Sequence, residues 1–221
     1  MGPHQTAQPH WLISLQPTLT LRFWLALLAQ VALLLIIPVS ALHTQMTGKT
    51  IVLQTGPVAP YNPLQGYYMQ LNYEISTPAQ LEALPGWEQV QLRARQLEAT
   101  PNATASPSLF VPGLEVYVIL QAPPENQQPP LPWQPIAVQL DAPTNLPPDQ
   151  VSLRGIYRRG QISFGIETYY IPEAQQAELN QQIQEVQISN GSRPFVVEVK
   201  VDAAGRAIPL GLWVGKERYQ F

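Results

Sequence analysis

The groups that could carry out acid–base chemistry in this sequence are carboxylates, because cysteine is absent and histidine is confined to one end of the chain. The 221-residue chain has no cysteine, and its three histidines, His4, His10 and His43, lie in or beside the N-terminal segment. After His43 the sequence provides no imidazole for a Ser-His-Asp triad, and no thiolate that could act as a nucleophile or hold zinc. We expect the protein not to be an enzyme and to bind no cofactor.

Three carboxylates, Glu74, Glu167 and Asp202, are the candidates for an enzymatic role. Two carboxyl groups no more than about 10 Å apart can cleave a glycosidic bond without histidine. Glu167 stands in the segment FGIETYY, where the neighbouring Tyr169 and Tyr170 favour an acid–base role. The competing interpretation is an ion pair across a hairpin with an arginine of the preceding strand: Arg154, Arg158 or Arg159.

The charge content argues against nucleic-acid and metal binding. Charged residues make up only 12% of the chain, and the net charge of -3 leaves no basic stripe for a phosphate backbone. Oxygen ligands for a metal would have to converge from separate parts of the sequence: Asp141, Asp149, Glu198 and Asp202. No spacing resembles a calcium-binding loop, so we expect no metal site.

An apolar run, FWLALLAQVALLLIIPVSAL, occupies residues 23–42. About 20 such residues in a helix cover the roughly 30 Å hydrocarbon core of a bilayer. Arg22 precedes the run, as expected on the cytoplasmic side. The run predicts a transmembrane anchor over residues 22–42, with residues 1–21 as a cytoplasmic tail and residues 43–221 as an exported domain.

Two other interpretations of the apolar run remain open. Pro38 ends the apolar helix, and the small residues after it are compatible with a signal peptide that is cleaved after Ala41. A helix buried in a protein core is the third interpretation. In the first two cases the remainder of the chain is exported.

Beyond His43 the apolar residues alternate with polar ones, which is typical of half-buried β-strands. The alternation predicts these strands: Lys49 to Gln54, Tyr68 to Ile75, Glu115 to Gln121, Ile136 to Leu140, Ser152 to Tyr157, Ile162 to Tyr169, Phe195 to Val201 and Ala207 to Val214. Two hairpins are predicted as well. One has its turn at Arg159, Gly160 and Gln161, and the other turns between Asp202 and Gly205.

Two helical segments interrupt the strands. The first begins with Thr77 as N-cap and Pro78 at the first helical position, and Pro85 and Gly86 divide it. The second carries an apolar stripe that should pack on the sheet: Leu179, Ile183 and Val186. This order of elements predicts an α+β fold, in which a single N-terminal transmembrane helix precedes a mostly antiparallel β domain. That domain should be barrel- or sandwich-like, with one or two helices packed on it.

The segment GYYMQLNY resembles the signature of the GDYXXLXY family of uncharacterised bacterial membrane-anchored proteins. Four signature positions match: Gly66, Tyr68, Leu71 and Tyr73. Tyr67 stands where the family has aspartate. Two later segments, GIETYYIPE and VEVKVDAAGRAIPLGLWVGKE, also resemble blocks of that family.

Alternation places Leu71 and Tyr73 on the core-facing side of a strand, with Gly66 at the bend that enters it. A functional interpretation makes Tyr68 and Glu74 part of a surface that recognises a partner or ligand. The candidate interaction residues are those of the motif and of the GIETYY segment: Gly66, Tyr67, Tyr68, Leu71, Tyr73, Glu74, Glu167, Tyr169 and Tyr170.

The resemblance implies a single-pass protein of a bacterial membrane, with its C-terminal domain in the periplasm or another extracytoplasmic space. Together with the missing chemistry, it leads us to expect a non-enzymatic accessory or assembly protein whose domain contacts an integral membrane protein complex. The other expected partner is the lipid bilayer, through residues 22–42. The alternative is an envelope carboxylate-dependent hydrolase, or a glycan- or small-ligand-binding domain.

Overall fold

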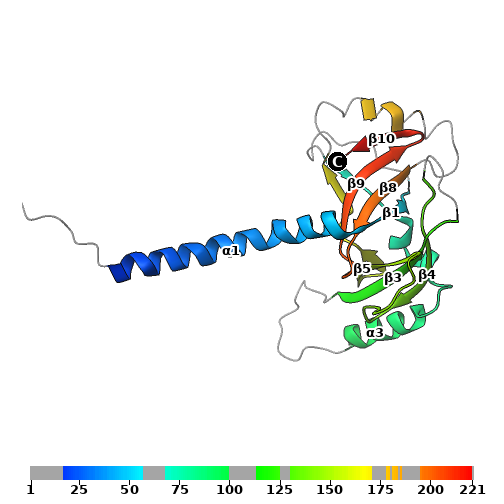
Figure 1. Cartoon of the computed structure of the whole chain (residues 1–221). Coiled ribbons are helices and arrows are strands. Elements are labelled where there is room, and N and C mark those ends of the chain that lie inside the picture. Colours follow the sequence, from blue (N-terminus) through cyan, green and yellow to red (C-terminus); the bar gives the residue numbers. More distant parts are fainter. Residues whose placement is uncertain are drawn as a thin grey trace, which may run out of the picture. The chain divides into compact units, whose positions relative to one another are not determined.

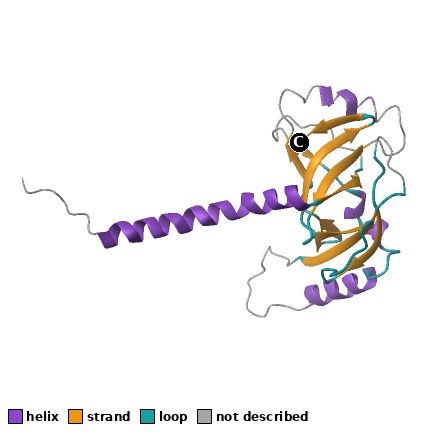
Figure 2. Ribbon diagram, viewed as in Figure 1, coloured by secondary structure: helices purple, strands orange, loops and turns teal. Residues whose placement is uncertain are grey.

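The computed structural model describes residues 17–56, 68–99, 113–124, 130–170, 178–179, 181–183, 185 and 195–220. Side chains are described at these positions except 17–21, 35–40, 68, 98–99 and 169–170. The chain divides into two compact units, Met1–Leu42 and His43–Phe221. A long helix characterises the first unit, and antiparallel sheets characterise the second (Figure 1, Figure 2).

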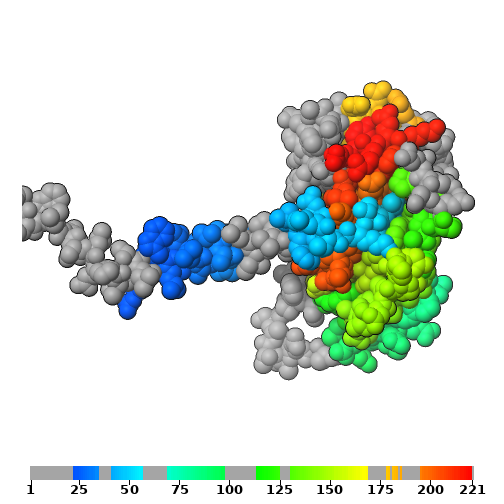
Figure 3. Space-filling model, in the orientation of Figure 1, coloured from blue at the N-terminus to red at the C-terminus, as the bar shows by residue number. Residues whose placement is uncertain are grey.

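The helix α1 (Pro17–Thr47) begins in the first unit, and its last residues, His43–Thr47, belong to the second. Figure 3 draws the helix in blue where its side chains are described. Its large apolar side chains are exposed: Phe23, Trp24, Leu25, Leu27, Leu28, Val31, Leu33, Leu34 and Leu42. Successive helical residues point about 100° apart, so this apolar surface extends around the helix. Within the described residues, no helix has both the length and the apolar content that crossing a membrane requires.

One four-stranded sheet of the second unit has the order β1-β8-β9-β10. Its strands are β1 (Lys49–Gln54), β8 (Phe195–Val201), β9 (Ala207–Val214) and β10 (Glu217–Gln220). The predicted bounds of β1, β8 and β9 are confirmed, and so is the hairpin that joins β8 to β9. The prediction lacks β10, because its sequence ERYQ shows no alternation of apolar residues.

The other four-stranded sheet has the order β4-β3-β5-β6. Its strands are β3 (Leu114–Gln121), β4 (Gln134–Gln139), β5 (Gln150–Arg158) and β6 (Gln161–Ser163). β5 and β6 form the second predicted hairpin, with Arg159 and Gly160 at φ angles of 49° and 81°. Two central residues with positive φ are typical of the type I′ turn that suits the twist of paired strands.

The predicted strand from Tyr68 to Ile75 is only partly correct. β2 (Tyr68–Gln70) ends early, a bridge joins Tyr73 to Thr55, and a 3-10 helix, η1 (Glu74–Ser76), follows. The alternation of burial nevertheless continues beyond β2, since these side chains are all buried: Met69, Leu71, Tyr73 and Ile75. Side-chain burial therefore follows the sequence pattern, whereas the backbone pairing does not.

The predicted strand from Ile162 to Tyr169 is divided in two. β6 ends at Ser163, and β7 (Thr168–Tyr170) begins after a turn in which the Glu167 carboxylate accepts a hydrogen bond from the Phe164 N–H. β7 pairs with β2 as a two-stranded antiparallel sheet. The predicted strand is interrupted because the chain leaves β5 after β6, and its next strand, β7, pairs with the distant β2.

Two helices of the second unit, α2 and α3, begin close to where they are predicted. α2 (Pro78–Leu81) follows Thr77, although the Thr77 hydroxyl donates to the carbonyl oxygen of Glu74 and does not cap the helix. α3 (Trp87–Ala99) begins after the predicted break. The described residues between 178 and 185 are helical.

The apolar stripe predicted for this last helical segment is confirmed where it is described. Leu179 and Ile183 are buried in the main hydrophobic cluster. Val186 lies outside the described residues. The segment therefore packs on the core, as its spacing of apolar residues indicates.

A single hydrophobic cluster draws on all three sheets. Its fully buried members include Leu53, Val197 and Leu212 from one four-stranded sheet and Val116, Leu120 and Leu153 from the other. The predicted α+β class with mostly antiparallel strands is confirmed. The described strands form three separate sheets and do not close into one barrel.

The backbone at Gly86, in the break before α3, lies very close to β4. Its φ is 90°, and an added Cβ would overlap the carbonyl oxygen of Val138. Gly160 has a similar φ of 81°, but no described atom lies within 4 Å of an added Cβ. We expect Gly86→Ala to lower the free energy of unfolding by at least ~3 kcal/mol, and the control Gly160→Ala by about 1 kcal/mol. Equal losses in urea unfolding would contradict the close approach.

Candidate functional site

Two segments that are far apart in the sequence meet at the Tyr73 side chain. Its hydroxyl donates a 3.0 Å hydrogen bond to the carbonyl oxygen of Ile166. Nearby, the Leu71 N–H donates a 2.7 Å hydrogen bond to the carbonyl oxygen of Glu167. These bonds continue the pairing of β2 with β7. The two sequence blocks GYYMQLNY and GIETYY are therefore held side by side.

The Tyr73 hydroxyl is a stable hydrogen-bond donor in this position. The residue is 1% exposed, and burial raises the pKa of Tyr73, as does the negative charge of Glu167 nearby. Ionisation would place a second negative charge beside Glu167 and would remove the proton that binds Ile166. Tyr73 therefore stays protonated at ordinary pH and acts as a structural tie.

Glu167 lies half-buried in the turn before β7. One of its carboxylate oxygens accepts the Phe164 N–H, and the other oxygen has no partner among the described residues. Arg154, one of the predicted ion-pair partners, binds Glu115 instead. Glu167 therefore stabilises the turn and keeps one oxygen for a further interaction.

A surface groove of about 790 Å³ lies between the segment after β2 and the β5–β6 hairpin. We call it the motif groove. Most of its polar lining comes from three places: Gln70 and Asn72 in the motif, Arg158 and Gln161 in the hairpin, and Glu167 and Thr168 where the turn leads into β7. Pockets that hold small ligands have volumes of roughly 300–1,000 Å³, so the motif groove is of a suitable size.

Several groups of the motif groove have unused hydrogen-bonding capacity. Five exposed side chains form no hydrogen bond with any described residue: Gln70, Asn72, Gln161, Ser163 and Thr168. The buried hydroxyl oxygen of Ser76, another lining residue, also lacks a partner among the described atoms. Because an unsatisfied buried polar atom costs free energy, such a group favours water or a ligand in its vicinity.

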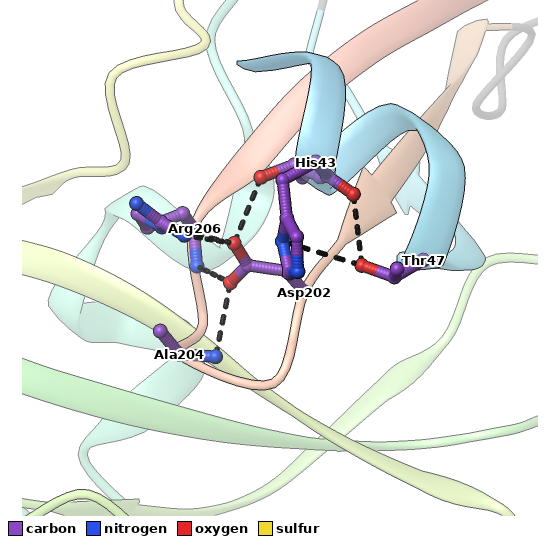
Figure 4. A network of polar contacts seen from close by, with 6 residues as sticks. His43, Thr47, Asp202, Ala204 and Arg206 are labelled. Atoms are coloured by element: carbon purple, nitrogen blue, oxygen red, sulfur yellow. Dashed lines mark hydrogen bonds and ion pairs between the residues drawn. The ribbon is translucent and has the colours of Figure 1, made fainter. Parts of the chain in front are cut away.

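The Asp202 carboxylate accepts hydrogen bonds from the turn between β8 and β9 and from Thr44 (Figure 4). The Asp202 side chain is 2% exposed and accepts hydrogen bonds from the Thr44 hydroxyl, the Ala204 N–H, and both the N–H and the guanidinium of Arg206. Burial alone would raise the pKa of Asp202, but these bonds together hold it below its usual value. Asp202 thus connects the last residues of α1, through Thr44, to the hairpin of β8 and β9.

Two of the other predicted oxygen ligands, Glu198 and Asp149, have separate partners. Glu198 accepts the Trp213 indole N–H at 2.7 Å and forms an ion pair with Arg218. Asp149 accepts a 2.6 Å hydrogen bond from Gln121. In the described ranges, no group of three histidine, aspartate or glutamate side chains is placed to hold a metal ion.

The structure brings part of the predicted interaction set together. Three of its members line the motif groove: Leu71, Tyr73 and Glu167. Three others are described by their backbones alone, which pair in β2 and β7: Tyr68, Tyr169 and Tyr170. Glu74 is half-buried at the first position of η1. Gly66 and Tyr67 lie outside the described residues.

Sequence reasoning missed the uncharged residues of the site. Asn72 and Gln161 enter the motif groove, and Thr44 binds Asp202, yet none of them carries a charge or an obvious reactive group. Their only sequence signals are their positions. Asn72 lies within the motif, Gln161 directly follows a hairpin turn, and Thr44 lies just after the apolar run.

The second unit is thus an α+β domain with antiparallel sheets, built on the pairing of two sequence blocks and bearing a polar groove. The sequence model of the family described as GDYXXLXY protein matches residues 30–212, and the chain belongs to this family. The comparisons with curated proteins and with solved structures gave no match. The paired blocks and the residues of the motif groove all fall inside the matched region.

Asp202→Asn tests whether the buried carboxylate holds the turn together. We expect a loss of about 2–3 kcal/mol in the free energy of unfolding at pH 7, because hydrogen bonds to a charged acceptor are replaced by weaker ones. The folded-state pKa of Asp202 is lowered, so its contribution is complete above the unfolded pKa and disappears as pH falls through the folded pKa. Urea unfolding at pH 7 and at about pH 2 measures both effects.

The control for this variant is Asp141→Asn, which changes an exposed aspartate. Its effect should stay within about 0.5 kcal/mol at both pH values. A loss in Asp202→Asn that is equally large at acid and neutral pH would contradict the role of the charge.

Proposed function

We propose that the protein is a non-enzymatic accessory or assembly protein, anchored in a membrane by residues 22–42, whose domain contacts an integral membrane protein complex on the extracytoplasmic side. The observation that carries this proposal is the exposed apolar surface around α1. A continuous apolar surface of this kind is normally covered by lipid or by another protein. The apolar run continues through residues 35–40, whose side chains lie outside the described ones.

The exposed fractions favour an anchoring role over a core-packing role for α1. Phe23, Leu25 and Leu33 are 65%, 68% and 68% exposed. A helix that packs into a protein core buries one apolar stripe and keeps a polar face, whereas a helix surrounded by lipid is apolar on every side. Removing each of these side chains from water contributes roughly 1.5–3 kcal/mol, which favours insertion.

The state of the candidate catalytic groups supports a role without catalysis. Asp202 is enclosed by donors from its own turn and by the Thr44 hydroxyl. Glu167 uses one oxygen to stabilise a turn. A carboxylate-dependent hydrolase needs two carboxyl groups that reach the same bond, and Asp202 does not offer one. The engagement of Asp202 removes one of the three candidate carboxylates, and this supports a role in binding or assembly.

The anchor is tested with the double variant Leu28→Arg, Leu33→Arg in the full-length chain. Each arginine near the centre of a spanning helix costs roughly 2.5–3.5 kcal/mol of insertion free energy. We expect the wild-type chain to stay with membranes after an alkaline wash and the arginine variant to be released. After mild detergent extraction and cross-linking, mass spectrometry of the wild-type sample should show an integral membrane protein at a constant ratio.

The control for this experiment is Leu28→Val, Leu33→Val, which keeps the run apolar and should behave like the wild type. Release of the wild-type chain by the wash, or a mature N-terminus at Leu42, would contradict the anchor and favour a cleaved signal peptide. A washed, membrane-bound chain that repeatedly purifies alone would contradict the partner.

A further inference from the structure

We propose that the motif groove is a binding site for a neutral, hydroxyl-rich ligand, namely a short oligosaccharide. This inference goes beyond the accessory function and does not depend on the membrane anchor. It starts from the groove of about 790 Å³ between the motif segment and the β5–β6 hairpin, and from the chemistry of its lining. A volume of this size suits a ligand of several hundred Å³.

The unused groups of the motif groove match sugar hydroxyls in kind. Gln70, Asn72 and Gln161 each offer an amide donor and a carbonyl acceptor, and Ser163 and Thr168 offer hydroxyls. With respect to the residues that the structure describes, none of these five side chains forms a hydrogen bond. A sugar hydroxyl donates and accepts at the same time, so it can pair with either end of an amide. The lining therefore suits a ligand with many hydroxyls.

A carboxylate oxygen of Glu167 points to the same class of ligand. Glu167 keeps one carboxylate oxygen without a described partner, and a carboxylate accepts hydrogen bonds from hydroxyls more strongly than a neutral acceptor does. A polyol that enters the groove could donate a hydrogen bond to the second Glu167 oxygen, which an apolar ligand could not.

The motif groove lacks the features of a protein-docking surface. Interface hot spots are usually large aromatic or apolar anchors that become buried at the centre of the contact. The large apolar residues that are exposed in the described part of the domain lie elsewhere: Met46, Leu92 and Leu131. Tyr73 lines the groove but is only 1% exposed. Protein docking is therefore less well supported here than binding of a polar small ligand.

The charges of the groove favour a neutral ligand over an ionic one. Arg158 and Glu167 bring one positive and one negative charge to the lining. A strongly anionic or cationic ligand would be attracted by one of them and repelled by the other. Because no exposed aromatic ring is described in the lining for a sugar to stack on, we expect hydrogen bonds to dominate and the dissociation constant to be on the order of millimolar.

The test is titration calorimetry of the purified full-length chain with three neutral probes: maltotriose, cellotriose and triacetylchitotriose. At least one of them should bind. Asn72→Ala and Gln161→Ala should each weaken that binding about fivefold, which corresponds to the loss of one hydrogen bond. Gln139→Ala is the matched control, because Gln139 is an exposed glutamine on β4 that does not line the groove. It should leave the affinity unchanged.

The fold of each variant is checked by its thermal midpoint, which should not change, because the replaced side chains are exposed. Three results would overturn the proposal. These are the absence of binding for all three neutral probes, binding that persists unchanged in the double variant Asn72→Ala, Gln161→Ala, and stronger binding of trigalacturonic acid, which would indicate an anion site at Arg158.

Discussion

The hydrogen bond from the Tyr73 hydroxyl to the carbonyl oxygen of Ile166 joins positions that are 93 residues apart. Both partners are buried. If one were removed, the other would stay buried without a hydrogen bond, which would lower the free energy of unfolding. The bond from Leu71 to Glu167 repeats the connection through the backbone. Because these two bonds bring the motif against the turn before β7, the position of β7 and the shape of the motif groove depend on them.

The polar contacts of the domain follow from its low content of charged residues. With only 12% charged residues, few side chains remain for ion pairs. Asp202 and Glu198 are each surrounded by donors that compensate their charge. Arg154 pairs with Glu115, and tyrosine, amide and hydroxyl groups contribute further polar contacts. The motif groove is polar but nearly neutral, because its lining contains one positive and one negative side chain, Arg158 and Glu167.

The fold could be predicted from the sequence where local pattern and tertiary pairing agree. β1, β8 and β9 alternate clearly, and the turn at Asp202 fixes the hairpin between β8 and β9. The segment from Tyr68 to Ile75 differs, because alternation predicts which side chains are buried but not which strand supplies the hydrogen bonds. Its partners, Thr55 and Glu167, come from distant parts of the chain.

The candidate site could be predicted only in part, for a related reason. Glu167 and Tyr73 were found because carboxylates and tyrosines are recognisable in a sequence. Asn72 and Gln161 are ordinary polar residues until the pairing of β2 with β7 and the β5–β6 hairpin place them on one groove. The match to the GDYXXLXY family covers the motif. The structure shows that the motif pairs with the turn before β7.

The motif tyrosine Tyr73 is a structural tie and not a reactive group. This role is measured by the free energy of unfolding of Tyr73→Phe, which removes one hydroxyl and leaves the ring in the core. We expect a loss of about 1–2 kcal/mol, because the Ile166 carbonyl would remain buried without its donor. An unchanged free energy of unfolding would contradict it.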